Sequence, residues 1–119
     1  MDRFGAEELR FGVHGGAVET SMMLALHPDL VRMDRARDFR STSQDRAAAY
    51  PVLGNGRSAK LGWMAQDLNA SGAAGDATQA SAEKGRALIA AAARALADLL
   101  AEISALPLGT VAPGPLDAR

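Results

Sequence analysis

A long stripe of apolar residues near the end of this 119-residue chain limits the folds that the sequence can adopt. The apolar positions recur at steps of three and four residues, which is the spacing of one face of an α-helix. They are Leu88, Ile89, Ala92, Leu96, Leu99, Leu100, Ile103 and Leu106. We expect a helix over residues 80–105, about 39 Å long. Thr78 or Ser81 is the expected N-cap, and Pro107 closes the helix.

A second helical pattern begins at Gly16 and continues to the proline at position 28. Proline disfavours the helical conformation in the residue before it, so we expect the helix to end there. Glu19 then lies in the first turn of this helix, and His14 lies just outside its N-terminus.

The segments between these helices carry weaker signals. Residues 7–13 are short and mixed, and we expect an extended segment there. Residues 34–58 are expected to be irregular, because they mix charges with Ser, Thr and a Gly-Asn-Gly turn. Residues 60–68 alternate loosely and predict a strand, and residues 69–77 are turn-like. The tail at 109–119 is expected to be disordered.

A group of arginines and the tryptophan on these segments also need an interpretation. Four arginines follow the second helix, and we interpret them as a solvated face that nearby acids neutralise. The arginines are Arg32, Arg35, Arg37 and Arg40, and the acids are Asp29, Asp34 and Asp38. Trp63, the single tryptophan, either packs in a half-buried position or forms a wall of a substrate pocket.

Composition excludes several classes of function. The net charge is −1, from 13 basic and 14 acidic residues, so no strong field would attract nucleic acid or an anionic membrane. The absence of cysteine excludes disulfides, zinc ribbons and thiol catalysis. The charged N-terminus does not have the pattern of a signal peptide. The longest apolar run, residues 87–93, is far shorter than a membrane span. We therefore expect a cytoplasmic protein of one domain.

His14 and Glu19 form the one pairing of a histidine with an acid that suggests chemistry. Gly15 and Gly16 let the backbone adopt unusual conformations and approach a substrate closely. The helix N-terminus offers free N–H groups to a substrate oxygen. A neutral imidazole can transfer protons near pH 7, and a carboxylate can bind a divalent cation. A purely structural hydrogen-bonding role for His14 remains open, and His27 is expected to serve only at a helix end.

Two blocks of sequence resemble the creatininase family of metal-dependent amidohydrolases. The first is HGGAVETS at residues 14–21, followed by a Leu-rich helix and the turn PDLV at residues 28–31. The second is GAAGDATQASAEKG at residues 72–85. Both blocks match signatures from the C-terminal half of that family, in the same order. The match runs from about Glu8 to Leu106.

The resemblance implies a fold, an activity and a set of site residues. Family members are three-layer α/β/α sandwiches with a mostly parallel sheet and a divalent metal, zinc or manganese. They hydrolyse a small-molecule cyclic amide or a formamide-type C–N bond, and they form homo-oligomers. By this resemblance His14 is the catalytic proton-transfer residue, and Glu19 is a metal ligand or its close neighbour. Independently of the resemblance, the residues themselves make Gly15, Gly16 and Trp63 the candidate substrate-binding residues.

The sequence departs from the family pattern at two points. The main metal-binding blocks of the family have no counterpart here, because His14 and His27 are the only histidines. We therefore expect residues 1–108 to be the C-terminal half of a creatininase-like α/β domain. Members that act on creatinine carry Trp-Asp-x-Glu before the histidine, where residues 10–13 read RFGV. Two alternatives remain: a non-catalytic fragment that serves as an interaction or assembly module, and a stand-alone α/β domain without metal.

Overall fold

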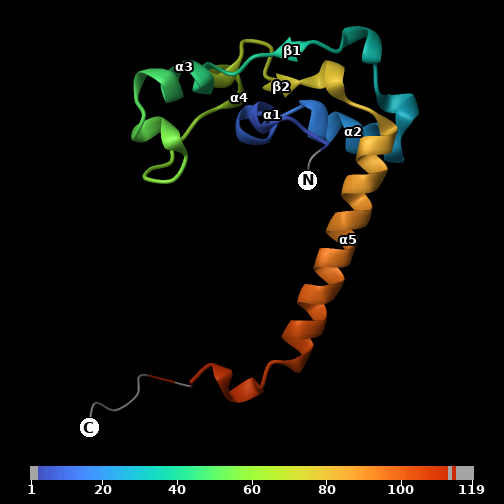
Figure 1. Ribbon diagram of the computed structural model, residues 1–119, viewed down its shortest axis with the longest axis vertical. Helices are drawn as coiled ribbons and strands as arrows, with labels where there is room; N and C mark the ends of the chain where they lie inside the picture. The colour runs from blue at the N-terminus through green and yellow to red at the C-terminus, as the bar shows by residue number, and fades with distance from the viewer. Residues whose placement is uncertain (1–2, 113, 115–119) are drawn as a thin grey trace. The chain divides into compact units, whose positions relative to one another are not determined.

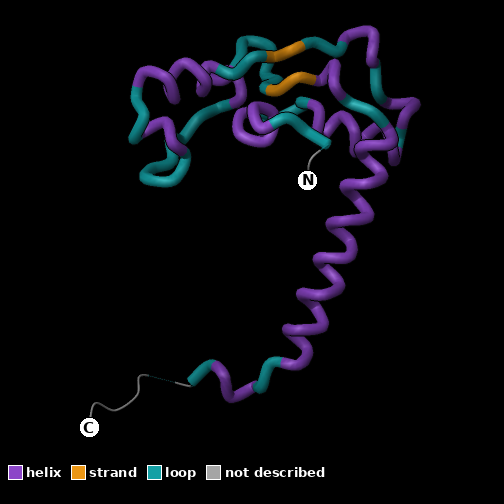
Figure 2. The backbone as a smooth tube through the Cα atoms, viewed as in Figure 1, coloured by secondary structure: helices purple, strands orange, loops and turns teal. Residues whose placement is uncertain are grey.

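A computed structural model describes residues 3–112 and 114 of the chain (Figure 1). The described part is rich in helix and contains one small sheet (Figure 2). The helices are α1 (Ala6–Phe11), α2 (Ala17–Leu26), α3 (Thr42–Ala49), α4 (Ala65–Leu68) and α5 (Ala82–Ala105). The strands are β1 (Asp38–Phe39) and β2 (Gly75–Asp76). The chain divides into two compact units, Met1–Ile89 and Ala90–Arg119.

The two helices predicted from apolar spacing are confirmed. Helix α2 starts directly after the Gly-Gly pair and ends at Leu26, two residues before Pro28. Helix α5 ends two residues before Pro107, as expected. Its N-cap is Ser81, whose hydroxyl accepts a hydrogen bond from the Lys84 N–H at 3.2 Å.

Three short helices form where the sequence predicted extended or irregular chain, so those predictions are wrong. Helix α1 replaces the expected extended segment, with acids in its first turn and Arg10 in its last turn, which suits the helix dipole. Helix α3 lies inside the supposed irregular region, and Ser41 caps it by accepting from the Ser43 N–H at 3.2 Å. Helix α4 covers the end of the segment that was expected to be a strand. The Asp67 carboxylate accepts a hydrogen bond from the Met64 N–H at 2.8 Å there.

The sheet joins two segments that lie far apart in the sequence. Strands β1 and β2 pair antiparallel, with Asp38 opposite Asp76 and Phe39 opposite Gly75. The expectation of parallel pairing is therefore not met by the described strands. Each strand has only two residues, and the connection between them contains α3 and α4. An additional antiparallel bridge joins His14 to Ala74, with N–H···O distances of 3.2 and 2.7 Å.

Small residues make up most of the buried core of the first unit. The buried side chains are Ala17, Ser21, Ser41, Leu68, Ala74 and Ala77. Ser21 on α2 is fully buried, and its hydroxyl accepts from the Ser81 N–H at 3.1 Å. Gly85 is required beside it, because a Cβ at that position would lie 1.9 Å from the Ser21 carbonyl oxygen. The glycine lets the first turn of α5 pack directly on the backbone of α2.

The apolar residues of α5 differ in solvent exposure between the start of the helix and its later turns. Leu88 and Ile89, in the first unit, are half-buried. The later apolar positions Leu96, Leu99, Leu100, Ile103 and Leu106 are each more than half exposed. No helix within residues 3–112 is long and apolar enough to cross a membrane. The expected disordered tail at 109–119 lies largely outside the described residues, and Leu108–Thr110 form a single 3-10 turn.

Candidate functional site

His14 and Glu19 lie next to each other at the start of α2, as the sequence predicted. The Nδ1 atom of His14 lies 3.5 Å from Oε2 of Glu19. The same oxygen accepts a hydrogen bond from the Gly15 N–H at 2.7 Å. Both side chains are at least half exposed, at 62% and 50%. The Nδ1 side of the imidazole therefore lies near a carboxylate, while much of the His14 side chain is exposed to solvent.

The backbone around this pair has little freedom. Gly15 has a positive φ of 66°, a conformation that residues other than glycine rarely adopt. Its N–H is taken by Glu19, and its carbonyl accepts from the Thr20 hydroxyl at 3.3 Å. Gly16 is buried, and a Cβ there would lie 2.9 Å from the Cα of Gly75. A substrate-binding role for the two glycines stays a prediction.

Glu8 holds the backbone around His14 and Glu19 through hydrogen bonds, and the sequence did not indicate this role. Its carboxylate accepts from the Asp76 N–H at 2.8 Å and from the Val18 N–H at 3.4 Å, so it ties α1 to β2 and α2. Glycines surround the carboxylate, since a Cβ at Gly12, Gly16 or Gly75 would collide with it. The signal that could have found Glu8 is this set of glycines, which extends from Gly12 to Gly75 in the sequence.

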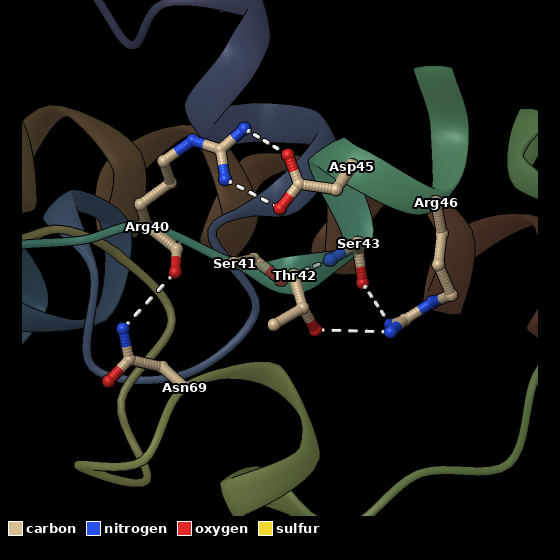
Figure 3. Close-up of polar contacts among 7 residues, drawn as sticks. All are labelled: Arg40, Ser41, Thr42, Ser43, Asp45, Arg46 and Asn69. Carbon is tan, nitrogen blue, oxygen red and sulfur yellow. Dashed lines mark hydrogen bonds and ion pairs between the residues drawn. The ribbon is translucent and has the colours of Figure 1, made fainter. Parts of the chain in front are cut away.

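A polar cluster joins the start of α3 to the turn before β2 (Figure 3). The guanidinium of Arg40 donates two hydrogen bonds to the Asp45 carboxylate, at 2.7 and 2.9 Å. Hydrogen bonding from Arg40 lowers the pKa of Asp45 below its ordinary value of 3.8, and its charge acts in the same direction. The Asn69 side chain also donates to the Arg40 carbonyl at 3.1 Å.

The expected neutralisation of the four arginines is therefore wrong for Arg40. Its carboxylate partner comes from α3 and not from the three acids that the sequence suggested. The remaining three, Arg32, Arg35 and Arg37, form no ion pair with any residue that the structure describes. They are exposed, as a solvated face would be.

Trp63 lies apart from the His14 and Glu19 pair in the lining of a hollow of about 190 Å³. Its side chain is 47% exposed, and Phe11 and Leu68 contribute to the same lining. The hollow reaches Val13 but does not include His14 or Glu19 among its lining residues. The predicted site residues thus divide between two places, and the role of Trp63 toward a substrate stays a prediction.

The described residues do not fit a complete metal site. Nowhere within residues 3–112 do three His, Cys, Asp or Glu side chains gather closely enough to hold an ion. A catalytic zinc generally requires three protein ligands. His27 does not add a donor, because it caps the C-terminus of α2 and is exposed to solvent. The pair formed by His14 and Glu19 could contribute to a metal site only with donors from elsewhere.

The chain is similar to known proteins of one family. The family model for creatininase, described as creatinine amidohydrolase, matches residues 1–100. A creatinine amidohydrolase from Pseudomonas putida is 35% identical over 89 residues, which are 75% of this chain and 30% of that protein. A crystal structure from Bacteroides fragilis, provisionally assigned as a creatinine amidohydrolase, matches with a TM-score of 0.67 and 29% identity.

The solved structure is matched over 89% of this chain and 39% of its own length. The chain thus spans about a third of the relatives that it resembles, and it carries the block around His14 and Glu19. The structural match includes the helix-rich arrangement with its small sheet. On these grounds the chain belongs to the creatininase family.

Proposed function

We propose that this chain is the C-terminal part of a metal-dependent amidohydrolase that cleaves a cyclic amide or formamide-type C–N bond. The observation that carries the proposal is the contact of 3.5 Å between His14 Nδ1 and Glu19 Oε2, in a chain of the creatininase family. In the intact protein we expect a three-layer α/β/α sandwich with a mostly parallel sheet, a cytoplasmic location and a homo-oligomeric assembly.

The role that we assign to His14 is proton transfer. Hydrolysis of an amide requires a proton on the departing nitrogen, because an amide anion is a poor leaving group. With Nδ1 facing Glu19, the Nε2 atom of His14 is left to face a substrate. An imidazole in this position can deliver the proton to the nitrogen and recover it from water.

Glu19 has two candidate roles, which the same atom could not easily fill together. Its Oε2 already accepts from the Gly15 N–H and faces His14, which suits a residue that orients the imidazole. By the family resemblance it is instead a ligand or close neighbour of a zinc or manganese ion. Because the described residues do not form a full ligand set, the remaining donors would have to come from a part of the protein outside this chain.

A second candidate function is a non-catalytic assembly module. The exposed apolar face of α5 favours it, since such a face is suited to pack against another protein surface. The two candidates differ in whether His14 matters to hydrolysis.

The test is a chimeric enzyme in which this chain replaces the matching segment of the Pseudomonas putida enzyme. We expect His14→Ala to lower turnover of a cyclic amide by about 10²–10⁴-fold while the bound metal, measured by elemental analysis, stays unchanged. Glu19→Ala should lower metal content first if Glu19 is a ligand, and turnover alone if it orients His14. His27→Ala is the matched control and should leave both quantities unchanged. Full turnover in the His14→Ala chimera would contradict the proposed role.

A further inference from the structure

The hollow beside Trp63 combines positive charge with aromatic walls. Three cationic side chains, from Arg10, Arg46 and Lys60, reach its lining. None of the described residues that line it is an aspartate or a glutamate. This is unusual for a chain whose overall charge is −1. All of the lining comes from residues 10–68, within one compact unit.

The cations keep their charge available because their contacts are with neutral groups. Arg46 donates to the hydroxyls of Thr42 and Ser43 at 3.0 and 2.9 Å, which uses two of the five guanidinium N–H groups (Figure 3). The nearby Asp45 acts on Arg46 through its charge, but both of its oxygens form their hydrogen bonds with Arg40.

The other two cations are similarly free of carboxylate partners among the described residues. Arg10 donates to the Gly54 carbonyl at 3.0 Å, and its guanidinium lies 4.7 Å from the centre of the Phe11 ring. Lys60 has no hydrogen bond to any residue within the described part of the chain. An anion entering the hollow would therefore meet three positive charges without displacing an existing ion pair.

The apolar part of the lining sets the size and kind of ligand. Phe11 and Trp63 supply aromatic faces, and Leu68 closes the hollow with a side chain that is only 1% exposed. A volume of about 190 Å³ is of the size that holds one ring, since a cavity of about 150 Å³ is enough for benzene. Most binding pockets for drug-sized molecules are larger.

We infer that this hollow is a binding site for a small organic anion, a carboxylate or phosphate attached to a single ring or short apolar group. The anion would lie against Arg46 and Lys60, and the apolar group would lie against Phe11 and Trp63. The lining includes neither His14 nor Glu19, so the inference stands independently of the proposed hydrolysis.

Trp63 provides the readout, because it is the only tryptophan in the chain. We would titrate the full chain with phenylacetate and follow tryptophan fluorescence, with calorimetry as a second measurement. Acetate tests the anion alone, 2-phenylethanol tests the ring alone, and 2-phenylethylamine tests the opposite charge. We expect saturable binding of phenylacetate, about tenfold tighter than acetate or 2-phenylethanol, and weaker binding as salt is added.

Substitutions then locate the site. Lys60→Met should weaken phenylacetate binding roughly two- to fivefold without affecting the fold, and Lys60→Arg should restore it. Arg46→Met should weaken binding about tenfold, with far-UV circular dichroism to check that α3 is intact. Arg35→Met removes an exposed arginine outside the hollow and should change nothing. Equal affinity for 2-phenylethanol and phenylacetate, no saturable signal, or unchanged binding in Lys60→Met would each overturn the inference.

Discussion

Glu8 and the glycines around it determine how the backbone near His14 is held. Glu8 accepts from N–H groups of two different elements, and Gly16 and Gly75 leave room for its carboxylate. Gly75 also has a φ of 141°, which residues with a Cβ rarely adopt. The Glu8 contact to Asp76 spans 68 residues. Local sequence patterns do not reveal such a pairing, because they report periodicity within one element and not which elements meet.

Gly75→Ala should therefore lower the free energy of unfolding strongly. The new Cβ would lie 2.7 Å from the Cα of Gly16 and 2.9 Å from Oε2 of Glu8. The positive φ adds backbone strain, and we expect a total loss of about 2–4 kcal/mol. Gly62→Ala is the control, because a Cβ there meets nothing within 4 Å. Thermal melts followed by circular dichroism would compare the two, and equal melting temperatures would contradict this account of Gly75.

At the scale of elements, local pattern predicted the helices that have clear start and stop signals. Helix α2 follows a Gly-Gly pair and precedes a proline, and α5 combines a serine cap with a long apolar stripe. The short helices α1, α3 and α4 were missed. Helices of four to eight residues are not stable by themselves. They form because of tertiary contacts, which a pass along the sequence does not show.

The position of α3 depends in part on the ion pair between Arg40 and Asp45, and this gives a pH prediction. The pKa of Asp45 is lower in the folded chain than in the unfolded one, so the pair stabilises the fold at neutral pH. That contribution is lost as the pH falls from about 4 downwards, through the lowered pKa.

Asp45→Asn should accordingly reduce the melting temperature at pH 7, and the difference from the unchanged chain should shrink as the pH falls below about 4. Asp29→Asn is a suitable control, since Asp29 is exposed and forms no ion pair within the described residues. A difference that persisted in full at low pH would show that Asp45 acts through packing and not through its charge.

The exposed face of α5 gives a second prediction at this scale. Leu96, Leu99 and Ile103 are each more than half exposed and lie on one stripe. An apolar face of this kind promotes self-association. Replacing all three with glutamine should reduce light scattering and binding of a hydrophobic dye. Replacing Ala90, Ala97 and Ala101, which lie outside the stripe, with glutamine is the control and should have little effect. If scattering does not fall in the variant with the three stripe residues replaced, this assignment is contradicted.

At the scale of the whole molecule, the described residues place His14 beside Glu19 but do not form a complete metal site. His14 and Glu19 lie together, whereas the described residues contain no cluster of three metal donors. The matched relatives are about three times as long as the part that this chain covers. The family could be predicted from the sequence, because two signature blocks are intact, whereas the role of His14 stays a prediction. The hollow beside Trp63 could not, because its lining comes from four separate segments.

The most direct test of this account compares the chain alone with the chain joined to the remaining part of a relative. The chain alone should retain no stoichiometric zinc or manganese after treatment with a chelator, and it should hydrolyse no cyclic amide. Co-expression with the rest of the Pseudomonas putida enzyme should restore both bound metal and turnover that depends on His14. The account is contradicted if the chain alone keeps one metal ion and hydrolyses the amide, or if the reassembled protein binds metal but remains inactive.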